Sequence, residues 1–254
     1  MTTKKLIIQT KFLNHLYKNH QALIDLNLEV FEGDIFGFLG HNGAGKTTTI
    51  NILTTLMPPS SGTAMVAGFD TVTQSMQVRR NIGYLPENVT FYNNLTAWEN
   101  LHYFARLSGV KNTEQRIAEV LDFLEFRGFE NKKLGEFSKG MRQRIGIAQA
   151  IIHEPKILFL DEPTSGLDPL GIKNLREIII RLNKEKHLTI FMNTHLLSEV
   201  AKTCTSIGVL NHGKLIYKDT LDNTLRRFPT EVSLEQIYVQ MEENGRPTLN
   251  NNNQ

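Results

Sequence analysis

The chain has 254 residues, enough for one large domain or two small ones with a substantial buried core. Its 40% hydrophobic and 21% charged residues are typical of a globular protein, and a net charge of +2 gives no overall attraction to nucleic acid. The single cysteine, Cys204, excludes an intramolecular disulfide framework and is expected to fill a small space in the core.

No stretch of the sequence predicts a membrane span or an export signal. The longest uncharged run, residues 47–69, is interrupted by polar side chains and by Pro58 and Pro59. The first five residues contain no apolar segment. We therefore expect a cytoplasmic protein whose work at a membrane, if it has any, needs a partner.

The first part of the chain predicts strands that lead to a glycine-rich loop. Residues 26–31 alternate apolar and polar side chains, as a half-exposed strand does, and residues 6–12 do so less regularly. Residues 34–39 are an apolar run typical of a buried strand. Tyr17 lies between the first two strands. Its ring is either a stacking surface for an adenine base or part of a turn, and the local sequence leaves both open.

The loop after residue 39 matches the pattern Gly-x4-Gly-Lys-Ser/Thr. Its residues are Gly40, His41, Asn42, Gly43, Ala44, Gly45, Lys46, Thr47 and Thr48. The glycines allow backbone N–H groups to converge on a phosphate, Lys46 can reach the β- and γ-phosphates, and the Thr47 hydroxyl can hold Mg²⁺. A helix predicted over residues 47–56 points its positive end at the same anion. The alternative, a glycine-rich turn with an incidental lysine, leaves this strand–loop–helix order unexplained.

A long helical stretch then separates two parts with α/β character. Short elements come first, at residues 63–68 (strand), 76–81 (helix) and 82–87 (strand ended by Pro86). Between residues 88 and 153, three helices follow one another without a strand. Thr96, Thr113 and Ser138 are their predicted N-caps. The stretch indicates an all-helical insertion in an α/β core.

The α/β pattern resumes with two acidic residues at the end of a strand. Residues 157–160 are consecutive large apolar residues, as in a strand buried on both faces of a parallel sheet. Asp161 and Glu162 follow, at the edge where α/β folds bind ligands. Two carboxylates at the end of a buried strand cost free energy of folding, unless they bind a cation or take part in proton transfer. Asp161 is thus a candidate Mg²⁺ ligand and Glu162 a candidate base for an attacking water. The alternative is two solvated acids in a surface loop.

One histidine lies at the same predicted edge. His195 follows the buried strand expected at residues 188–192 and could contact a γ-phosphate or the attacking water. A lone histidine after a strand is more often structural, but Lys46, Asp161 and Glu162 favour a role in the site. The remaining elements are predicted at residues 170–183 (helix), 206–210 and 214–217 (strands joined by a hairpin turn), 233–241 (amphipathic helix) and 243–254 (disordered polar tail).

These motifs, in this order, resemble the ATP-binding subunits of ABC transporters. The resemblance covers residues 6–241. Residues 40–48 correspond to the Walker A loop, 157–162 to Walker B and the catalytic glutamate, 165–168 to the D-loop, 137–143 to the ABC signature, and His195 to the switch histidine. The family implies an α/β fold, in which a P-loop NTPase core carries an antiparallel β subdomain and an all-helical signature subdomain at about 88–153. One ATP-binding domain over residues 1–242 is expected.

The resemblance also implies roles for individual residues. Tyr17 is placed as the aromatic that stacks on adenine, and Glu162 and His195 as the catalytic residues of ATP hydrolysis. Ser138 and Gly140 of the signature are expected to bind the γ-phosphate of the ATP held by the opposite subunit. The implied cofactors are ATP and Mg²⁺, the metal being held by Thr47, Glu87 and Asp161.

Two parts of these motifs depart from the family pattern. The signature usually reads Leu-Ser-Gly-Gly-Gln, and here Lys139 and Met141 replace a glycine and the glutamine. Lys139 can add a cation, whereas Met141 lacks the amide. Glu87 replaces the usual Q-loop glutamine, and its carboxylate suits Mg²⁺ but adds negative charge near a triphosphate. These variants resemble the branch that serves ABC-2 type exporters. Within that branch, the residues next to Gly40 and Glu87 most resemble those of the ATPase of nitrous oxide reductase copper-site maturation.

The resemblance implies two partners and a location. The partners are a multi-span membrane permease and a second copy of the chain or a related ATPase subunit, with no nucleic acid expected. The location is the cytoplasmic face of the inner (plasma) membrane. Phe91, Tyr92 and Trp98 follow Glu87 and are candidates for contacting the permease, although Trp98 suits the core equally well.

Two alternatives to a transport ATPase remain. A soluble ABC protein acting on ribosomes or DNA usually has two ATP-binding domains or a long coiled-coil insertion, and this chain has neither signal. A nucleotide-gated module with little turnover would fit the altered signature, but Glu162 argues against it.

Overall fold

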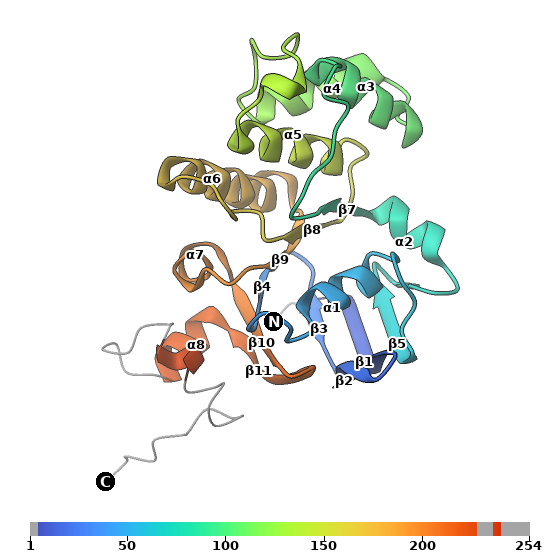
Figure 1. Cartoon of the computed structure of the whole chain (residues 1–254), viewed down its shortest axis with the longest axis vertical. Coiled ribbons are helices and arrows are strands. Elements are labelled where there is room, and N and C mark those ends of the chain that lie inside the picture. The colour runs from blue at the N-terminus through green and yellow to red at the C-terminus, as the bar shows by residue number, and fades with distance from the viewer. Residues whose placement is uncertain (1–4, 228–235, 240–254) are drawn as a thin grey trace.

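The computed structural model describes residues 5–227 and 236–239, which form two sheets and their covering helices (Figure 1). The first sheet is antiparallel and is built around one long strand, β1 (Leu6–Tyr17). Its other strands are β2 (His20–Leu26), β3 (Glu29–Phe31) and β5 (Ser61–Val66), all paired with β1, and β6 (Phe69–Asp70), paired with β5. This sheet is the antiparallel β subdomain that the family resemblance implies.

The prediction of one strand over residues 26–31 is wrong. Strand β2 ends at Leu26 and β3 begins at Glu29. Side chains interrupt the ladder between them, because Asn27 Oδ1 accepts a hydrogen bond from the Phe12 N–H and Thr10 Oγ1 accepts one from the Leu28 N–H. Polar side chains that bond to the backbone compete with strand pairing in this way.

The second sheet is mainly parallel and carries the predicted buried strands. Its order is β11-β10-β4-β9-β8-β7, and only β11 runs antiparallel to its neighbour. The bounds are β4 (Ile35–Leu39), β7 (Ile82–Leu85), β8 (Ile157–Asp161), β9 (Thr189–Asn193), β10 (Ser206–Asn211) and β11 (Lys214–Thr220). The carboxyl ends of β4, β7, β8 and β9 therefore meet at one edge, as the sequence predicts.

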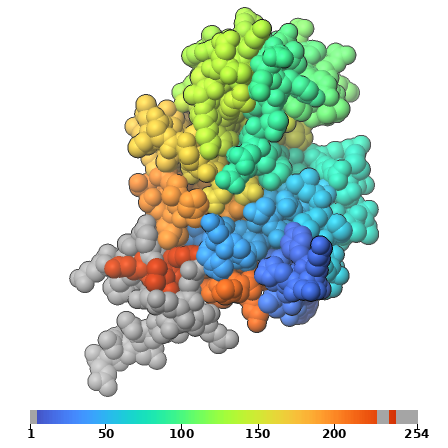
Figure 2. Space-filling view, in the orientation of Figure 1, coloured from blue at the N-terminus to red at the C-terminus, as the bar shows by residue number. Residues whose placement is uncertain are grey.

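The predicted helical insertion forms a lobe beyond β7, at the top of Figures 1 and 2. It consists of α3 (Ala97–Leu107), α4 (Thr113–Phe123), a short 3₁₀ helix (Leu134–Glu136) and α5 (Lys139–Ile151). Thr96 and Ser138 cap α3 and α5 as predicted, and Thr96 forms a full capping box with Glu99. Thr113 is instead the first residue of α4, and its hydroxyl donates to the carbonyl of Val110.

The other helices cover the two sheets. They are α1 (Lys46–Leu53), α2 (Ser75–Asn81), α6 (Pro169–Lys186), α7 (Leu197–Thr203) and α8 (Leu221–Arg227). Helices α7 and α8 are not anticipated from the sequence. Of the helix predicted over 233–241, only residues 236–239 are described and they are helical, while the tail predicted over 243–254 lies outside the described residues. Within the described ranges, no helix has the length and apolarity needed to cross a membrane.

The parallel sheet separates two core clusters, and four phenylalanines of its strands lie in one of them. Alternate residues of a strand point to opposite faces. Phe36 and Phe38 of β4, Phe159 of β8 and Phe191 of β9 lie on the face towards the antiparallel sheet, and Phe191 lies 5.3 to 5.4 Å, centroid to centroid, from the other three rings.

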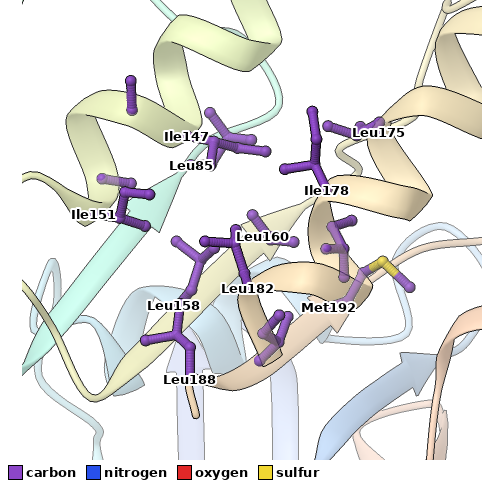
Figure 3. Close-up of a cluster of buried hydrophobic side chains, with 14 of the residues drawn as sticks. Leu85, Ile147, Ile151, Leu158, Leu160, Leu175, Ile178, Leu182, Leu188 and Met192 are labelled. Atoms are coloured by element: carbon purple, nitrogen blue, oxygen red, sulfur yellow. The ribbon is translucent and has the colours of Figure 1, made fainter. Parts of the chain in front are cut away.

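On the opposite face of the sheet, aliphatic side chains pack against α5 and α6 (Figure 3). Leu158 and Leu160 of β8 contribute here, and Leu85 of β7 packs close to Gly146 of α5. A Cβ at Gly146 would overlap the Leu85 side chain, so this glycine allows α5 to approach the sheet. Helix α5, which Ser138 caps, is thereby packed on β7, the strand that leads to Glu87.

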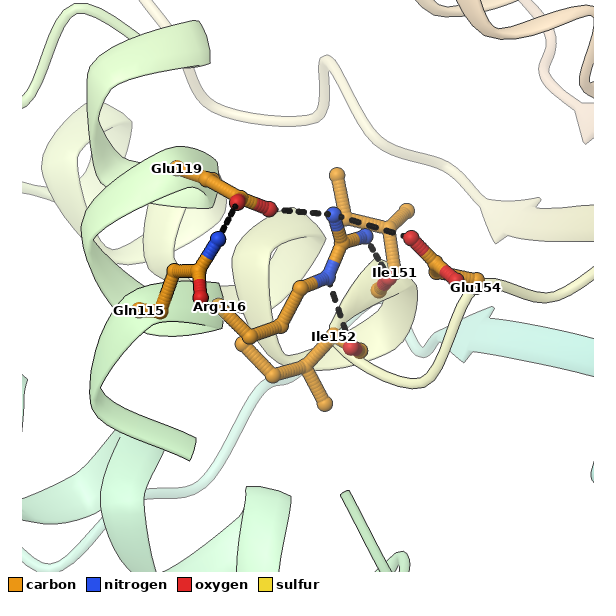
Figure 4. Close-up of polar contacts among 6 residues, drawn as sticks. All are labelled: Gln115, Arg116, Glu119, Ile151, Ile152 and Glu154. Carbon is orange, nitrogen blue, oxygen red and sulfur yellow. Dashed lines mark hydrogen bonds and ion pairs between the residues drawn. The ribbon is translucent and has the colours of Figure 1, made fainter. Parts of the chain in front are cut away.

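Arg116 of α4 binds the carboxyl end of α5 (Figure 4). Its Nη2 donates to the carbonyl of Ile151 and its Nε to that of Ile152, both at 3.0 Å. Glu154 and Glu119 lie 3.3 and 3.5 Å from Nη1 and balance its charge. The terminal carbonyls of a helix have no hydrogen-bond donor within the helix. The guanidinium provides these donors and so joins α4 to α5.

We predict that Arg116→Ala lowers the free energy of unfolding by about 2 kcal/mol, because it leaves two helix-end carbonyls without their charged donor. Chemical denaturation measures this change. Arg127→Ala is the control, since the ion pair of Arg127 with Asp122 is exposed and its loss should change stability by less than about 0.5 kcal/mol. Equal effects of the two substitutions would contradict the prediction.

Candidate functional site

One cavity of about 480 Å³ at the carboxyl edge of the parallel sheet gathers most of the predicted site residues. It is lined by Tyr17, His20, Ala22, Asn42, Gly43, Gly45, Lys46, Thr47, Thr48, Glu87, Asp161, Glu162, Asn193 and His195. Gly40, His41 and Ala44 belong to the same loop but do not line this cavity. Ser138 and Gly140 lie elsewhere, in the helical lobe.

The glycine-rich loop is held tightly between neighbouring backbones. Gly45 has a φ of 107°, and a Cβ on it would overlap the carbonyl oxygen of Ala22 in β2. Gly213, in the β10–β11 turn, donates its N–H to the carbonyl of Ala44 at 2.9 Å. Lys46 Nζ donates to the carbonyls of Gly40 and His41 at 2.6 and 3.0 Å. The loop therefore has a fixed shape, with its ammonium group at the loop's centre.

Helix α1 begins directly after Gly45, and Lys46, Thr47 and Thr48 of its first turn line the cavity. No side chain caps its first turn, and no acidic residue lies there. Unpaired N–H groups at a helix N-terminus bind anions, and the Lys46 ammonium adds a positive charge beside them. This donor set fits a chain of phosphates.

Tyr17, at the carboxyl end of β1, lines the same cavity. Its hydroxyl lies 3.2 Å from Met57 Sδ and 3.5 Å from Thr48 Oγ1, and its ring meets His15 edge to face at 4.5 Å. These contacts fix the ring while leaving 42% of the residue exposed. An exposed ring of fixed orientation can stack on a flat base.

The carboxyl groups of Asp161, Glu162 and Glu87 line the same cavity as Lys46. Asp161 is buried and accepts a hydrogen bond of 2.5 Å from Asn193 Nδ2 on β9. Burial raises the pKa of Asp161 above its usual range, and the negative charges of Glu162 and Glu87 raise it further against the opposing effects of Asn193 and Lys46. A divalent cation would relieve this repulsion. Hydroxyl and carboxylate oxygens from Thr47, Glu87 and Asp161 suit Mg²⁺. This ion usually keeps several waters and takes its other ligands from one or two carboxylates and from the phosphates of the substrate.

Glu162 is held next to His195. The Glu162 Oε2 and His195 Nδ1 atoms are 2.8 Å apart, an ion-pair distance, although they are not aligned as a hydrogen bond. The Glu162 N–H donates to the carbonyl of Asn193, and its φ of 47° is unusual for a residue with a side chain. Strained backbone of this kind costs about 1–3 kcal/mol and concentrates at functional sites.

The signature residues face a separate hollow of about 390 Å³ between the helical lobe and the start of α6. Ser138 is exposed and its Oγ accepts the N–H of Met141, which leaves the hydroxyl hydrogen available. The Lys139 side chain extends over Gly166 of the D-loop. Within one chain, the signature residues and the cavity of the glycine-rich loop are therefore separate.

Sequence reasoning missed three residues that line the cavity, His20, Ala22 and Asn193. His20 pairs with Tyr17 across the β1–β2 hairpin, so the hairpin itself would have suggested it. Asn193 follows a predicted strand, but its bond to Asp161 depends on β8 and β9 being neighbours. That pairing leaves no signal in either strand alone.

Comparison with known proteins identifies the family. The sequence profile of the family described as "ABC transporter" matches residues 23–165. The bacitracin transport ATP-binding protein BcrA of Bacillus licheniformis is 42% identical over 221 residues, which cover 87% of this chain and 72% of BcrA. The chain belongs to the ABC transporter family. It is an ATP-binding subunit of that family, a class that hydrolyses ATP and works with membrane permease subunits.

Solved structures agree with this assignment. A structure described as the ATP-binding subunit of an ABC transporter superposes with a TM-score of 0.81 at 32% identity, covering 92% of this chain and 99% of that one. The ATP-binding cassette MJ0796, in a dimeric post-hydrolysis state with ADP and Pi, gives 0.76 at 26% identity, covering 85% and 99%. The predicted ABC ATPase fold is confirmed.

We predict that Asp161→Asn raises the melting temperature of the nucleotide-free subunit at pH 7 by about 2–4 °C, or about 1 kcal/mol. The pKa of Asp161 is higher in the folded protein, so its ionisation costs stability as the pH rises through the folded pKa. The asparagine avoids that cost and keeps an oxygen for Asn193. Calorimetry measures the shift.

The gain from Asp161→Asn should vanish near pH 3, where the wild-type carboxyl is protonated. Asp122→Asn, at an exposed position, is the control and should leave the melting temperature unchanged. A destabilised Asp161→Asn at pH 7 would contradict the prediction.

Proposed function

We propose that this subunit is the ATPase of an ABC-2 type exporter, attached to the cytoplasmic face of the membrane through a separate permease. One observation carries the proposal. Residues of the glycine-rich loop line one cavity together with Glu87, Asp161, Glu162 and His195, while the signature residues line another. The name of the relative BcrA, a bacitracin transport protein, and the variants Lys139, Met141 and Glu87 support an exporter.

We propose a role for each site residue, and its position in the cavity supports that role. Tyr17 stacks on the adenine. The loop from Gly40 to Thr48, with the Lys46 ammonium, binds the phosphates. Thr47, Glu87 and Asp161 would hold Mg²⁺, which would neutralise charge on the phosphates. The extra charge of Glu87 strengthens metal binding relative to the usual glutamine.

Hydrolysis uses the pair at the edge of the sheet. Glu162 orients a water molecule and accepts its proton as the water oxygen bonds to the γ-phosphorus. The bond from that phosphorus to the bridging oxygen of ADP breaks, and phosphate leaves. His195 holds the Glu162 carboxylate in place and contacts the γ-phosphate. Both residues lie on loops at the ends of β8 and β9, whose pairing fixes their separation.

Two copies facing head to tail would complete both sites. Ser138 and Gly140 of one copy then contact the γ-phosphate of the ATP bound by the other, with the Lys139 ammonium nearby. ATP holds this interface closed, and hydrolysis releases it. The dimeric MJ0796 cassette supports the arrangement.

The permease is proposed to dock on an aromatic surface of the helical lobe. Tyr92 and Tyr103 are about half exposed, and their rings pack together with that of Phe104, 5.3 to 6.4 Å apart. Phe91 and Trp98 instead pack into the core. The surface follows Glu87 in the chain, so movement at the nucleotide can reach the permease.

Motif neighbours support a finer proposal about the system served. Residues 40–42 and 84–92 resemble the ATPase of nitrous oxide reductase copper-site maturation. BcrA points instead to export of a peptide antibiotic. The permease, and not this subunit, selects the substrate, so identifying the copurified permease decides between them.

We predict that Glu162→Gln lowers the ATP hydrolysis rate at least about 100-fold, because the water loses its proton acceptor. The same variant should form a stable dimer when ATP is added, as measured by light scattering. Glu177→Gln, an exposed change on α6, is the control and should behave as wild type.

Adding Lys46→Ala to Glu162→Gln should abolish the ATP-dependent dimer. Full hydrolysis by Glu162→Gln would contradict the role of Glu162. A monomer under all conditions, despite measured ATP binding, would contradict closure by two copies alone and would assign closure to the permease.

We predict that Tyr103→Asp reduces copurification of a multi-span membrane protein at least about tenfold while ATP binding is unchanged, because a charge would face the apolar permease segment. Detergent pull-down and mass spectrometry measure the yield. Leu225→Asp, at an exposed position on α8, is the control. Retention of ribosomes or nucleic acid in place of a membrane protein would overturn the exporter proposal.

A further inference from the structure

A second cavity lies next to the nucleotide site. It has a volume of about 270 Å³ and is lined by Leu39, Gly40, His41, Asn42, Thr194, His195, Leu197 and Tyr238. His195 and Asn42 line both cavities, so the two are separated only by the loop of the switch histidine and the start of the phosphate loop. Tyr238 is the only residue of this lining that comes from the end of the described chain.

The turn that carries Tyr238 is firmly docked. Residues 236–239 are helical, and Ile237 within them is only 1% exposed. Ile237 belongs to the core cluster that includes Val200 of α7 and Cys204, which follows α7, and Tyr238 packs against the same cluster. Val239 on the opposite side is 49% exposed. One side of this turn is therefore buried against the core, and Tyr238 extends the contact to the second cavity.

The loop of His195 is held by one hydrogen bond within the loop and by the contacts of the helix that follows it. Thr194 is buried, and its Oγ1 accepts the N–H of Leu196. Helix α7, which begins at Leu197, is tied to α6 because Glu199 receives hydrogen bonds of 3.0 Å from Arg176. The His195 side chain itself is 56% exposed, so its position depends on the loop. On the side that faces the second cavity, Tyr238 lines the cavity together with Thr194 and His195 of this loop and Leu197 of α7.

We infer that Tyr238 is a positioning residue for His195: its ring closes the second cavity and keeps the switch-histidine loop against the phosphate loop. Without the ring, the cavity gives the loop room to move away from Glu162. Small displacements of catalytic groups lower reaction rates by large factors. The phosphate-binding loop is held by other contacts, so we expect little effect on ATP binding. The inference rests on the catalytic role proposed above for His195.

Steady-state ATP hydrolysis tests the inference with three variants. Tyr238→Ala should lower kcat about fivefold while KM for ATP changes less than about twofold. Tyr238→Phe keeps the ring and should retain at least about half of the wild-type kcat. Val239→Ala, on the exposed side of the same turn, is the matched control and should be indistinguishable from wild type.

Hydrogen exchange gives a readout that does not need turnover. The backbone amides of residues 194–200 should exchange at least about threefold faster in Tyr238→Ala, and not in Val239→Ala or Tyr238→Phe. Wild-type kcat and wild-type exchange in Tyr238→Ala would overturn the inference. Equal losses in Tyr238→Ala and Val239→Ala would do so as well.

His195→Ala separates this inference from the proposed function. If His195→Ala keeps full kcat, the catalytic role of His195 is wrong, and the exchange measurement alone then decides whether Tyr238 holds the loop. If His195→Ala is slow and Tyr238→Ala is not, the role of His195 stands and Tyr238 does not position it.

Discussion

The nucleotide site depends on how closely the phosphate loop packs between two other backbones. A Cβ at Gly40 would overlap the carbonyl oxygen of Leu210 in β10, and one at Gly45 would overlap that of Ala22 in β2. The loop therefore sits in a gap that only glycine fits, and its shape exists before any ligand arrives. Because binding then needs little ordering of the loop, more of the interaction energy remains for the nucleotide.

The same constraint connects distant parts of the chain. The gap is formed by β2 of the antiparallel sheet and by the β10–β11 hairpin of the parallel one, so the two sheets must be assembled before the loop is correct. Gly213 of the hairpin bonds both to Ala44 of the loop and, through its carbonyl, to Ile24 of β2. A change in how the sheets pack would reach the loop directly.

The acidic part of the site has the opposite character, because it costs stability. Asp161 is buried beside two other carboxyl groups, and Glu162 has strained backbone. The paired strands β8 and β9 hold these groups in place through many apolar contacts and the Asn193–Asp161 bond. Proteins commonly accept such a loss of stability at a functional site, where a rigid scaffold offsets it.

The sequence by itself determined the elements that depend on neighbouring residues. The phosphate loop, the capped starts of α3 and α5 and the buried strand before Asp161 are all visible there, since capping and periodicity act over a few positions. The same local rules failed at residues 26–31, where side chains of Asn27 and Thr10 interrupt the strand.

Only the tertiary structure decided which residues meet across the chain. It brought Asn193 to Asp161 and placed Tyr238 in the lining of one cavity with His195. Asn193 and Asp161 are 32 positions apart in the printed sequence, and such neighbours arise from strand order and helix packing. Neither leaves a periodic signal in one segment, because each depends on the surface that another segment presents.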